Sequence, residues 1–190
     1  MKCIVCENWS LFIICKKCQK KLLNPGFYKR QLDEDFYVYS FYSFNELENL
    51  LTSKYYFHGD RVFNILAKLT FSKFAQSFNY TNDVLAVGVD DHTRHDFSHT
   101  AILTKHLKSR YIQPKYNSLK AKNPVKYAGR DLEFRQNNPR KFQLKNVNNQ
   151  SLILVDDLVT TGTTLLEARK VCKKNNNEVL FALCLADAKL

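Results

Sequence analysis

The segment at residues 152–164, with the sequence LILVDDLVTTGTT, constrains this chain more than any other. Its apolar start predicts a short buried strand, and two adjacent carboxylates, Asp156 and Asp157, stand at the carboxyl end of that strand. A turn of Thr and Gly follows and opens a helix at about Thr164. Strand ends of a parallel α/β sheet form the ligand-binding edge of that architecture. The segment therefore predicts both an α/β fold and the position of a site within it.

The residue types in this segment suit a ligand that carries both a phosphate and a sugar. In a turn rich in Thr and Gly, backbone N–H groups and hydroxyls converge on a phosphate, which the start of the next helix also favours. Paired carboxylates accept hydrogen bonds from sugar hydroxyls or hold a hard cation such as Mg²⁺. An ordinary capped helix, with Asp157 or Thr160 as a turn residue, explains one acid but not two acids followed by this turn. A Walker-type loop is excluded, because no Gly-Lys-Ser/Thr follows.

Over its whole length, the segment resembles the 5-phosphoribosyl-1-pyrophosphate (PRPP) loop of type I phosphoribosyltransferases. The resemblance implies that Asp156 and Asp157 face the ribose 2′ and 3′ hydroxyls and hold Mg²⁺ together with the ligand. It also implies that the residues after them wrap the 5′-phosphate. The PRPP-binding residues expected on this basis are Asp156, Asp157, Val159, Thr160, Thr161, Gly162, Thr163 and Thr164.

A second motif lies at the other end of the chain, where Cys3-x-x-Cys6 is followed by Cys15-x-x-Cys18. Two such pairs supply four thiolates, the set that tetrahedral Zn²⁺ takes in closed structural sites. Disulfides, which require an oxidising compartment, and incidental buried cysteines are the alternatives. We expect structural zinc in a small ribbon over residues 1–26, because the motif opens the chain without an export signal. The apolar residues expected to cover the metal are Trp9, Leu11, Phe12, Ile13 and Ile14.

Basic residues are segregated along the chain. The net charge is +11; residues 1–30 hold seven Lys/Arg against one acid, and residues 101–150 hold twelve against two. Such segregation indicates a polyanionic partner such as a nucleic acid, or a phosphate-rich ligand, and a solvated surface in a Lys-rich chain is the alternative. The candidate DNA-binding lysines are Lys16, Lys17, Lys115, Lys120, Lys122 and Lys126. No apolar run reaches the ~18 residues of a membrane span, so the chain is expected not to be transmembrane.

The remaining pattern predicts strands that alternate with helices, which is typical of a parallel sheet flanked by helices. Strands are expected at residues 35–44 (as a hairpin), 84–89, 111–113, 142–144, 151–155 and 178–185, and helices at 45–55, 60–78, 96–109 and 164–174. Asn45 is expected to cap the first helix, and Cys172 and Cys184 to pack in the core. His95 and His99 have metal-ligand spacing, but no nearby carboxylate or Cys completes a set, so a second transition-metal site is not expected.

A four-Cys ribbon joined to a phosphoribosyltransferase-like domain, in a chain of this length, resembles the ComF family. Further segments fit that family's pattern, namely residues 56–60 (YFHGD), 87–89 (VGV), 94–99 (RHDFSH) and 133–137 (EFRQN). By this resemblance Gly88 and Arg94 lie on the pyrophosphate side of the PRPP pocket. Asp96, Ser98 and His99 depart from the family pattern on that side, so binding of the ligand is predicted more directly than its turnover.

The resemblance also implies domains, a function and a location. It places a zinc ribbon at residues 1–26 and a type I phosphoribosyltransferase-like domain at residues 27–190. ComF members are linked to DNA uptake in naturally competent bacteria. A cytoplasmic protein is therefore implied, peripheral at the inner face of the membrane, that handles single-stranded DNA with a membrane uptake complex or a helicase and keeps a PRPP/Mg²⁺ pocket. The alternative is a soluble phosphoribosyltransferase that transfers phosphoribose to a nitrogen nucleophile, in which no residue stands out as a general base.

Overall fold

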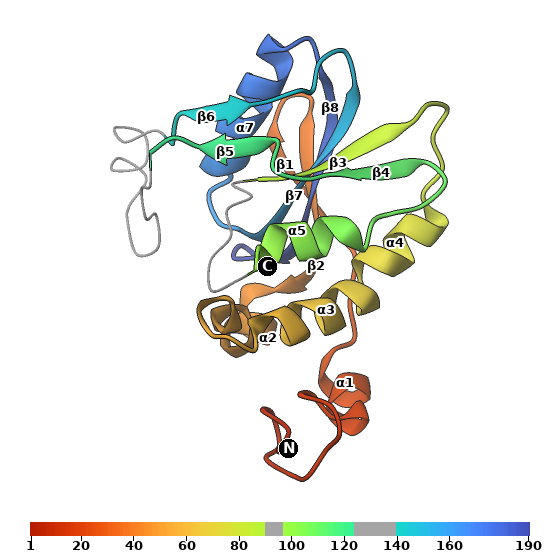
Figure 1. Cartoon of the computed structure of the whole chain (residues 1–190), viewed down its shortest axis with the longest axis vertical. Helices are drawn as coiled ribbons and strands as arrows, with labels where there is room; N and C mark the ends of the chain where they lie inside the picture. The colour runs from red at the N-terminus through yellow and green to blue at the C-terminus, as the bar shows by residue number, and fades with distance from the viewer. Residues whose placement is uncertain (90–96, 124–139) are drawn as a thin grey trace.

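The computed structural model describes residues 1–89, 97–123 and 140–190. Its core is a six-stranded sheet with the order β1-β2-β8-β7-β3-β4, and a separate small sheet pairs β5 with β6 (Figure 1). The strands are β1 (Tyr28–Asp33), β2 (Phe36–Ser43), β3 (Val84–Gly88), β4 (Ile112–Lys115), β5 (Leu119–Ala121), β6 (Phe142–Leu144), β7 (Ser151–Val159) and β8 (Glu178–Asp187). The helices are α1 (Lys16–Leu22), α2 (Phe44–Leu51), the 3-10 helix η1 (Thr52–Tyr55), α3 (Gly59–Leu69), α4 (Phe71–Ser77), α5 (His99–Lys105) and α7 (Thr163–Lys174).

The larger sheet confirms the predicted α/β class. Its pairings are parallel from β2 through β8, β7 and β3 to β4, and only the edge strand β1 runs antiparallel to its neighbour β2. The chain leaves β3 through α5 to reach β4 on one side, and later enters β7 on the other side of β3, from where α7 leads to β8. The connections of β3 and β7 thus diverge. This makes their carboxyl ends the topological switch point, where open α/β sheets hold ligands.

Helices cover both faces of the sheet. On one face Ile153 and Val155 of β7 pack with α3 and α5, and on the other Leu152 and Leu154 pack with α7 and the β5–β6 sheet. All four side chains are 0% exposed. Figure 1 shows α2 to α5 gathered on one side of the strands and α7 on the other. A strand buried on both faces needs apolar residues at consecutive positions, which explains the unbroken run that opens the 152–164 segment.

The strand β7 is longer than predicted. It runs to Val159, so Asp156 and Asp157 lie inside the paired strand, close to its carboxyl end, and not beyond it. Asp156 pairs with Cys184, and Val159 pairs with Asp187 of β8. The reason is the partner strand, because β8 itself continues to Asp187 and offers pairing that the local pattern of polar residues did not reveal.

The N-terminal hairpin differs from the prediction. Only one strand, β2, falls in residues 35–44, and its antiparallel partner is β1, which precedes that segment. The sequence of β1, YKRQLD, is mostly polar, because β1 is an edge strand with one face toward solvent. The short strand β5, which pairs with β6, was also not predicted.

Helix boundaries differ where side chains bind the backbone. Ser43, and not Asn45, caps α2, in a capping box with Glu46. The helix predicted at residues 60–78 is divided at Thr70, whose hydroxyl donates to the carbonyl of Leu66 at 2.7 Å. Ser98 caps α5 by accepting from the N–H of Ala101 at 3.1 Å, so α5 is shorter than residues 96–109.

The helices are short. The longest that the structure describes, α7, has 12 residues. Within residues 1–89, 97–123 and 140–190, no helix combines the length and the apolar character that a bilayer span requires.

The first part of the chain forms a small cysteine-containing module that packs on the helical layer. Its first half is a tight turn closed by an isolated bridge between Lys2 and Trp9, and its second half is α1, which Cys15 caps. Ile13 and Ile14 are buried with the helical core, as expected. Three other residues expected to cover the metal do not: Trp9 is 83% exposed, Leu11 94% and Phe12 47%. This part of the prediction is wrong, because the turn carries these side chains away from the core.

Candidate functional site

Two carboxylates stand side by side on β7, next to the switch point. Asp156 is half-buried, whereas Asp157 is 5% exposed. The N–H of Asp157 donates to Oδ1 of Asp156 at 2.8 Å and holds that side chain against its own strand. Neighbouring residues of a strand point to opposite faces, and Asp157 shares the face of Val155, toward the helical layer of η1 and α5.

Asp157 is paired with a cation from a distant part of the chain. The ammonium Nζ of Lys54, on η1, lies 2.6 Å from Oδ2 of Asp157, and the two side chains are 21% and 7% exposed. On the other side, Nε2 of His99, the first residue of α5, lies 3.9 Å from Oδ1 of Asp157. The acid that was expected to face a sugar thus carries its own counter-charge.

His99 and the two aspartates form one group. Their candidate ligand atoms all lie within 4.8 Å of one another. The expectation that no carboxylate accompanies His99 is therefore wrong, because α5 follows β3 and β3 is the neighbour of β7 in the sheet. Carboxylate oxygens and an imidazole together can hold a divalent cation. Asp156 and His99 are half-buried, so the group lies at the border of the fold and not deep within it.

The two carboxyl groups differ in acidity. Burial and the neighbouring charge of Asp157 raise the pKa of Asp156 well above its usual value. Burial acts in the same direction on Asp157, but Lys54 and His99 outweigh it and hold its pKa below the usual range. Burial opposes charge on Lys54, yet the Asp157 carboxylate keeps the pKa of Lys54 above its ordinary value. The pair therefore holds one firmly ionised acid and one that gains from a nearby positive charge.

The turn from β7 into α7 requires glycine. Gly162 has φ +87°, in the left-handed region, and a Cβ placed there would lie 2.7 Å from Cδ2 of Leu32 on β1. The hydroxyls of Thr161 and Thr163 are 2.9 Å apart. The first N–H groups of a helix have no partner within it, and the α7 helix that starts at Thr163 presents them to this turn. The predicted helix start at Thr164 is correct to one residue.

The other residues predicted to bind PRPP lie in different environments, namely a strand end, the ends of the turn and the core. Gly88 ends β3 opposite Val155, and a Cβ on it would meet the Thr100 side chain at 3.1 Å. Thr160 and Thr164 are half-buried at the ends of the turn. The side chain of Val159 is 2% exposed and belongs to the core, and its carbonyl accepts the N–H of Ala188 at 2.9 Å. Arg94 lies outside the described residues.

The four cysteines of the two pairs meet. Their Sγ atoms lie within 4.8 Å of one another, and Sγ of Cys6 and Cys15 are 3.8 Å apart. The N–H of Cys15 donates to Sγ of Cys3 at 3.3 Å, and the N–H of Cys18 donates to Sγ of Cys15 at 3.4 Å. Burial opposes ionisation of Cys3, but hydrogen bonds from the backbone of Cys15, Cys6 and Val5 lower its pKa to about 6. Four thiols with N–H groups directed at them fit a tetrahedral metal such as zinc. The two remaining cysteines, Cys172 and Cys184, are fully buried, as predicted.

The predicted DNA-binding lysines do not form one surface. Lys16 and Lys17 are exposed on α1, Lys115 and Lys120 are half-buried on β4 and β5, and Lys122 is exposed. Figure 1 shows α1 and β5 at opposite ends of the molecule. Lys126 lies outside the described residues.

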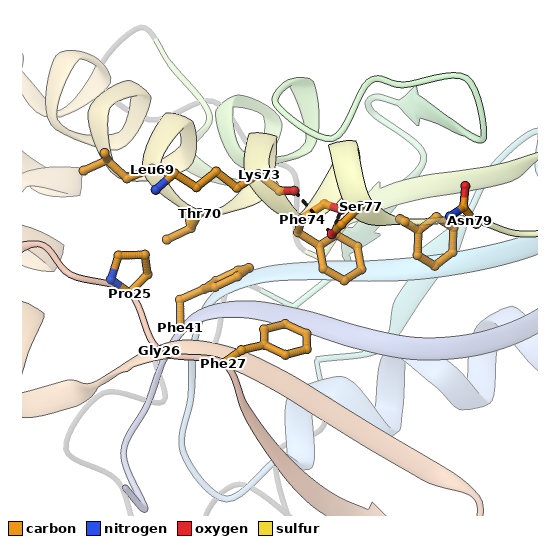
Figure 2. Close-up of a pocket in the computed structure, with 11 residues that line it drawn as sticks. Pro25, Gly26, Phe27, Phe41, Leu69, Thr70, Lys73, Phe74, Ser77 and Asn79 are labelled. Carbon is orange, nitrogen blue, oxygen red and sulfur yellow. Dashed lines mark hydrogen bonds between the residues drawn. The ribbon is translucent and has the colours of Figure 1, made fainter.

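A cavity of about 600 Å³ lies away from the acid pair, between the segment before β1, strand β2 and helices α3 and α4. Phe27, Phe41 and Phe74 line it, and Ser77 donates to the carbonyl of Phe74 at 3.0 Å (Figure 2). A second cavity of about 400 Å³ lies between the cysteine module and α2–η1. Neither is lined by the residues of the acid pair or the turn, so neither was predicted from the sequence motifs.

Sequence reasoning missed two residues around the site. Lys54 contacts Asp157, and Arg30 of β1 donates to the carbonyl of Thr160 at 2.9 Å. His99 was expected on the pyrophosphate side of the pocket, but its approach to Asp157 was not predicted. Arg30 and Lys54 lie 130 and 103 positions from the groups they bind. No local pattern marks them, and only the strand order brings them to the turn.

Comparisons with known proteins give a distant resemblance. No family model matches the chain. A curated relative, the transcriptional regulator GfcR of Methanosphaera stadtmanae, is 41% identical over 44 residues, which is 23% of this chain and 22% of that protein. The chain thus matches about a fifth of the length of this relative.

Similar solved structures include phosphoribosyltransferases. A hypoxanthine phosphoribosyltransferase from Staphylococcus aureus is 13% identical, with a TM-score of 0.41 over 66% of this chain and 62% of that one. An adenine phosphoribosyltransferase is 12% identical, with a TM-score of 0.37 over 88% and 89% of the two chains. The UMP synthase of Leishmania donovani is 15% identical, with a TM-score of 0.39 over 66% and 22%. These likenesses are too distant to support an argument about activity, which rests on the site itself.

Proposed function

We propose that this chain binds a phosphorylated ribose of the PRPP type at the switch point between β3 and β7. One observation carries the proposal. At the carboxyl end of β7, the Asp156–Asp157 pair is followed by a turn with a left-handed glycine, and this turn opens helix α7. Ligands of open α/β sheets bind at such points, and a turn of this form directs N–H groups at a phosphate. The acid pair therefore suits the ribose of such a ligand, and the turn suits its phosphate.

Each part of the site has a role in this proposal. Thr160 to Thr164 bind the 5′-phosphate through hydroxyls and backbone N–H groups, and Asp156 and Asp157 accept hydrogen bonds from the ribose hydroxyls. Gly88 lets the backbone approach the pyrophosphate, with Arg94 as its cationic partner. A Mg²⁺ ion brought with the ligand is held by Asp156 and Asp157 and supplies neutralising charge. Asp156, whose acidity is suppressed by burial and by Asp157, is the carboxyl group that a cation or hydroxyl donor stabilises most.

Calorimetric titration with PRPP and Mg²⁺ tests the pocket. We expect saturable binding to the unmodified chain and a loss of at least about tenfold in affinity for Asp156→Asn and for Asp157→Asn, since each removes a charge-assisted hydrogen bond. Glu178→Gln is the matched control, because this exposed acid lies at the amino end of β8, whereas the site lies at the carboxyl ends of the parallel strands. Absence of heat with the unmodified chain, or equal loss in the control, would refute the proposal.

We propose further, from the ComF resemblance, that the chain handles single-stranded DNA. The basic charge of residues 1–30 supports this, and so does the exposure of Lys16, Lys17, Trp9 and Leu11 in the same module. Lysines bind phosphates and an exposed aromatic ring stacks on bases without sequence preference, and such binding weakens with salt. In a salt-titrated gel shift, Lys16→Glu/Lys17→Glu should weaken binding. Lys170→Glu/Lys174→Glu, on the exposed side of α7, is the control with the same charge change. Equal weakening by both variants contradicts a DNA surface on α1.

The second candidate function is phosphoribosyl transfer. In that reaction a nitrogen nucleophile forms a bond to ribose C1 while the C1–O bond to pyrophosphate breaks, and the nitrogen loses a proton. Orientation and charge stabilisation carry such a step, so it needs no nucleophilic side chain. Pyrophosphate release, measured with a panel of nitrogenous bases and amines, tests it. Binding of PRPP with no release for any acceptor leaves the binding function and removes the transferase.

Zinc at the four cysteines completes the proposal. The cluster fits a closed structural site, which orders the N-terminal module and takes no part in chemistry. Metal analysis of the purified chain should find one zinc per molecule, and Cys6→Ser should abolish it. Disulfide formation between the pairs, detected by mass spectrometry of the chain as isolated, would contradict it.

A further inference from the structure

Arg30, on the edge strand β1, reaches across the end of the sheet to β8 and to the turn that follows β7. Its Nε lies 2.6 Å from Oδ2 of Asp187, the last residue of β8, and its Nη2 donates to the carbonyl of Thr160 at 2.9 Å. We propose that Arg30 is the positioning residue of the phosphate-binding turn, an inference that rests on the proposed function. It acts by fixing the peptide group that opens the turn.

The anchor for Arg30 is firmly placed. Asp187 is 1% exposed, its Oδ1 accepts the N–H of Lys189 at 2.9 Å, and its backbone pairs with Val159. A buried carboxylate requires a partner, so Asp187 holds the guanidinium of Arg30 in one position. The planar fork of arginine then directs a second donor at Thr160 in a fixed geometry, which the single ammonium group of lysine on its flexible stem does not impose.

The contact with Thr160 sets the direction of the next N–H. The described peptide bonds are all trans, so the N–H of Thr161 points away from the side on which Arg30 holds the carbonyl of Thr160. That N–H belongs to the turn proposed to bind phosphate. If the peptide group flipped, the carbonyl oxygen would face the anion and repel it. Arg30 thereby stabilises the orientation that binding needs.

A second side chain of β1 supports the same turn. Arg30 and Leu32 are the inward-facing residues of the strand, and Leu32 lies against Gly162. A strand places alternate residues on one face, so a single face of β1 contacts both the start and the end of the turn. The hairpin is therefore part of the site, although none of its residues belongs to the PRPP-loop motif.

The same hairpin has an ion pair that does not touch the turn, and it supplies a matched control. Arg169 of α7 contacts Asp33 at 3.2 Å and Asp35 at 2.5 Å, at the far end of β1. Removal of Arg169 loosens the hairpin but leaves the carbonyl of Thr160 with its donor. Loss of Arg30 removes both the hairpin contact and the donor.

The test compares Arg30→Met, Arg30→Lys and Arg169→Met in the full chain. The first readout is amide hydrogen exchange of residues 160–163 without ligand, which should accelerate at least about tenfold in Arg30→Met and remain unchanged in Arg169→Met. The second is calorimetry with PRPP and Mg²⁺, in which Arg30→Met should lose at least about tenfold in affinity and Arg30→Lys should recover only part of it. Arg169→Met should stay within about twofold of the unmodified chain, as a variant without a contact to the turn.

The two readouts separate the inference from the proposed function. If the unmodified chain does not bind PRPP, the proposed function fails, while faster exchange confined to the Arg30 variants still shows that Arg30 orders the turn. Unchanged exchange in Arg30→Met, or equal acceleration in Arg169→Met, overturns the positioning role. Should Arg30→Met not fold, Arg30→Lys gives the same comparison.

Discussion

The switch-point site and the cysteine module are built in opposite ways. The site stands on β7, whose residues Leu152 to Val155 are all 0% exposed, and two packed faces of the sheet fix it. The module has a short helix, one isolated bridge and a few buried side chains, while Trp9 and Leu11 lie almost fully in solvent. The sheet alone therefore orders the first site before any ligand arrives. The second region has a small core, so we expect it to need the zinc proposed at its four cysteines in order to be ordered.

Loss of the metal gives the largest expected effect. Structural zinc contributes about 10 kcal/mol to such modules, so Cys15→Ser or chelation should unfold residues 1–26. Limited proteolysis and metal analysis check this, with Cys172→Ala, a buried cysteine outside the cluster, as the variant that retains zinc. Affinity for PRPP should change by less than about twofold, because the site is ordered by the sheet. A tenfold loss of that affinity on chelation would break the comparison.

Removal of Lys54 should have the next largest effect. It leaves Asp157 buried without its counter-charge, and breaking a buried pair in this way costs about 3 kcal/mol. Urea unfolding of Lys54→Met measures the loss. In the background of Asp157→Asn the same substitution should be much less costly, because no buried charge remains. Additive losses in the double variant would show that the pair is not the source of stability.

Gly162→Ala tests the turn itself. A left-handed φ and the approach of Leu32 make any side chain unfavourable there, and the expected loss of stability is about 1–2 kcal/mol. Affinity for PRPP should fall at least about tenfold because the N–H groups move. The comparison variant is Gly26→Ala, where the obstructing group is the movable ring of the exposed Tyr28. If both variants bind alike, the turn is not the phosphate site.

The smallest expected effect concerns His106, which belongs to neither the switch-point site nor the cysteine module. His106 contacts Ser72 at 2.9 Å and Asn64 at 3.0 Å, and burial, then Lys105 and Lys68, lower its pKa below the ordinary value of 6.5. The folded state therefore binds fewer protons than the unfolded state below that pH. This contribution to stability should be complete above pH 6.5 and should be lost as the pH drops through the lowered pKa. Thermal unfolding of His106→Gln between pH 7.5 and 5.5 should show a flatter slope, and an unchanged slope would contradict this.

Local patterns predicted what local forces determine. The buried start of β7, the helix α7 and the meeting of four cysteines follow from residues that are close in sequence. The polar strand β1 could not be recognised, because its stability comes from pairing with β2 and not from its own composition. The burial of Asp157 and its bond to Lys54 depend on the order of strands, which spacing within one motif does not contain.

The position of β8 between β2 and β7 governs when this protein can fold on the ribosome. The N-terminal hairpin lies next to a strand that is synthesised more than a hundred residues later. Until residues 163–187 emerge, apolar side chains of β2 such as Phe36 and Val38 lack the residues of α7 and β8 that belong to the cluster in which they are buried. Nascent chains therefore expose an apolar strand until β8 has been synthesised, and such long-range pairing folds slowly. Because of this strand order, we expect the chain to need chaperones while it is being synthesised.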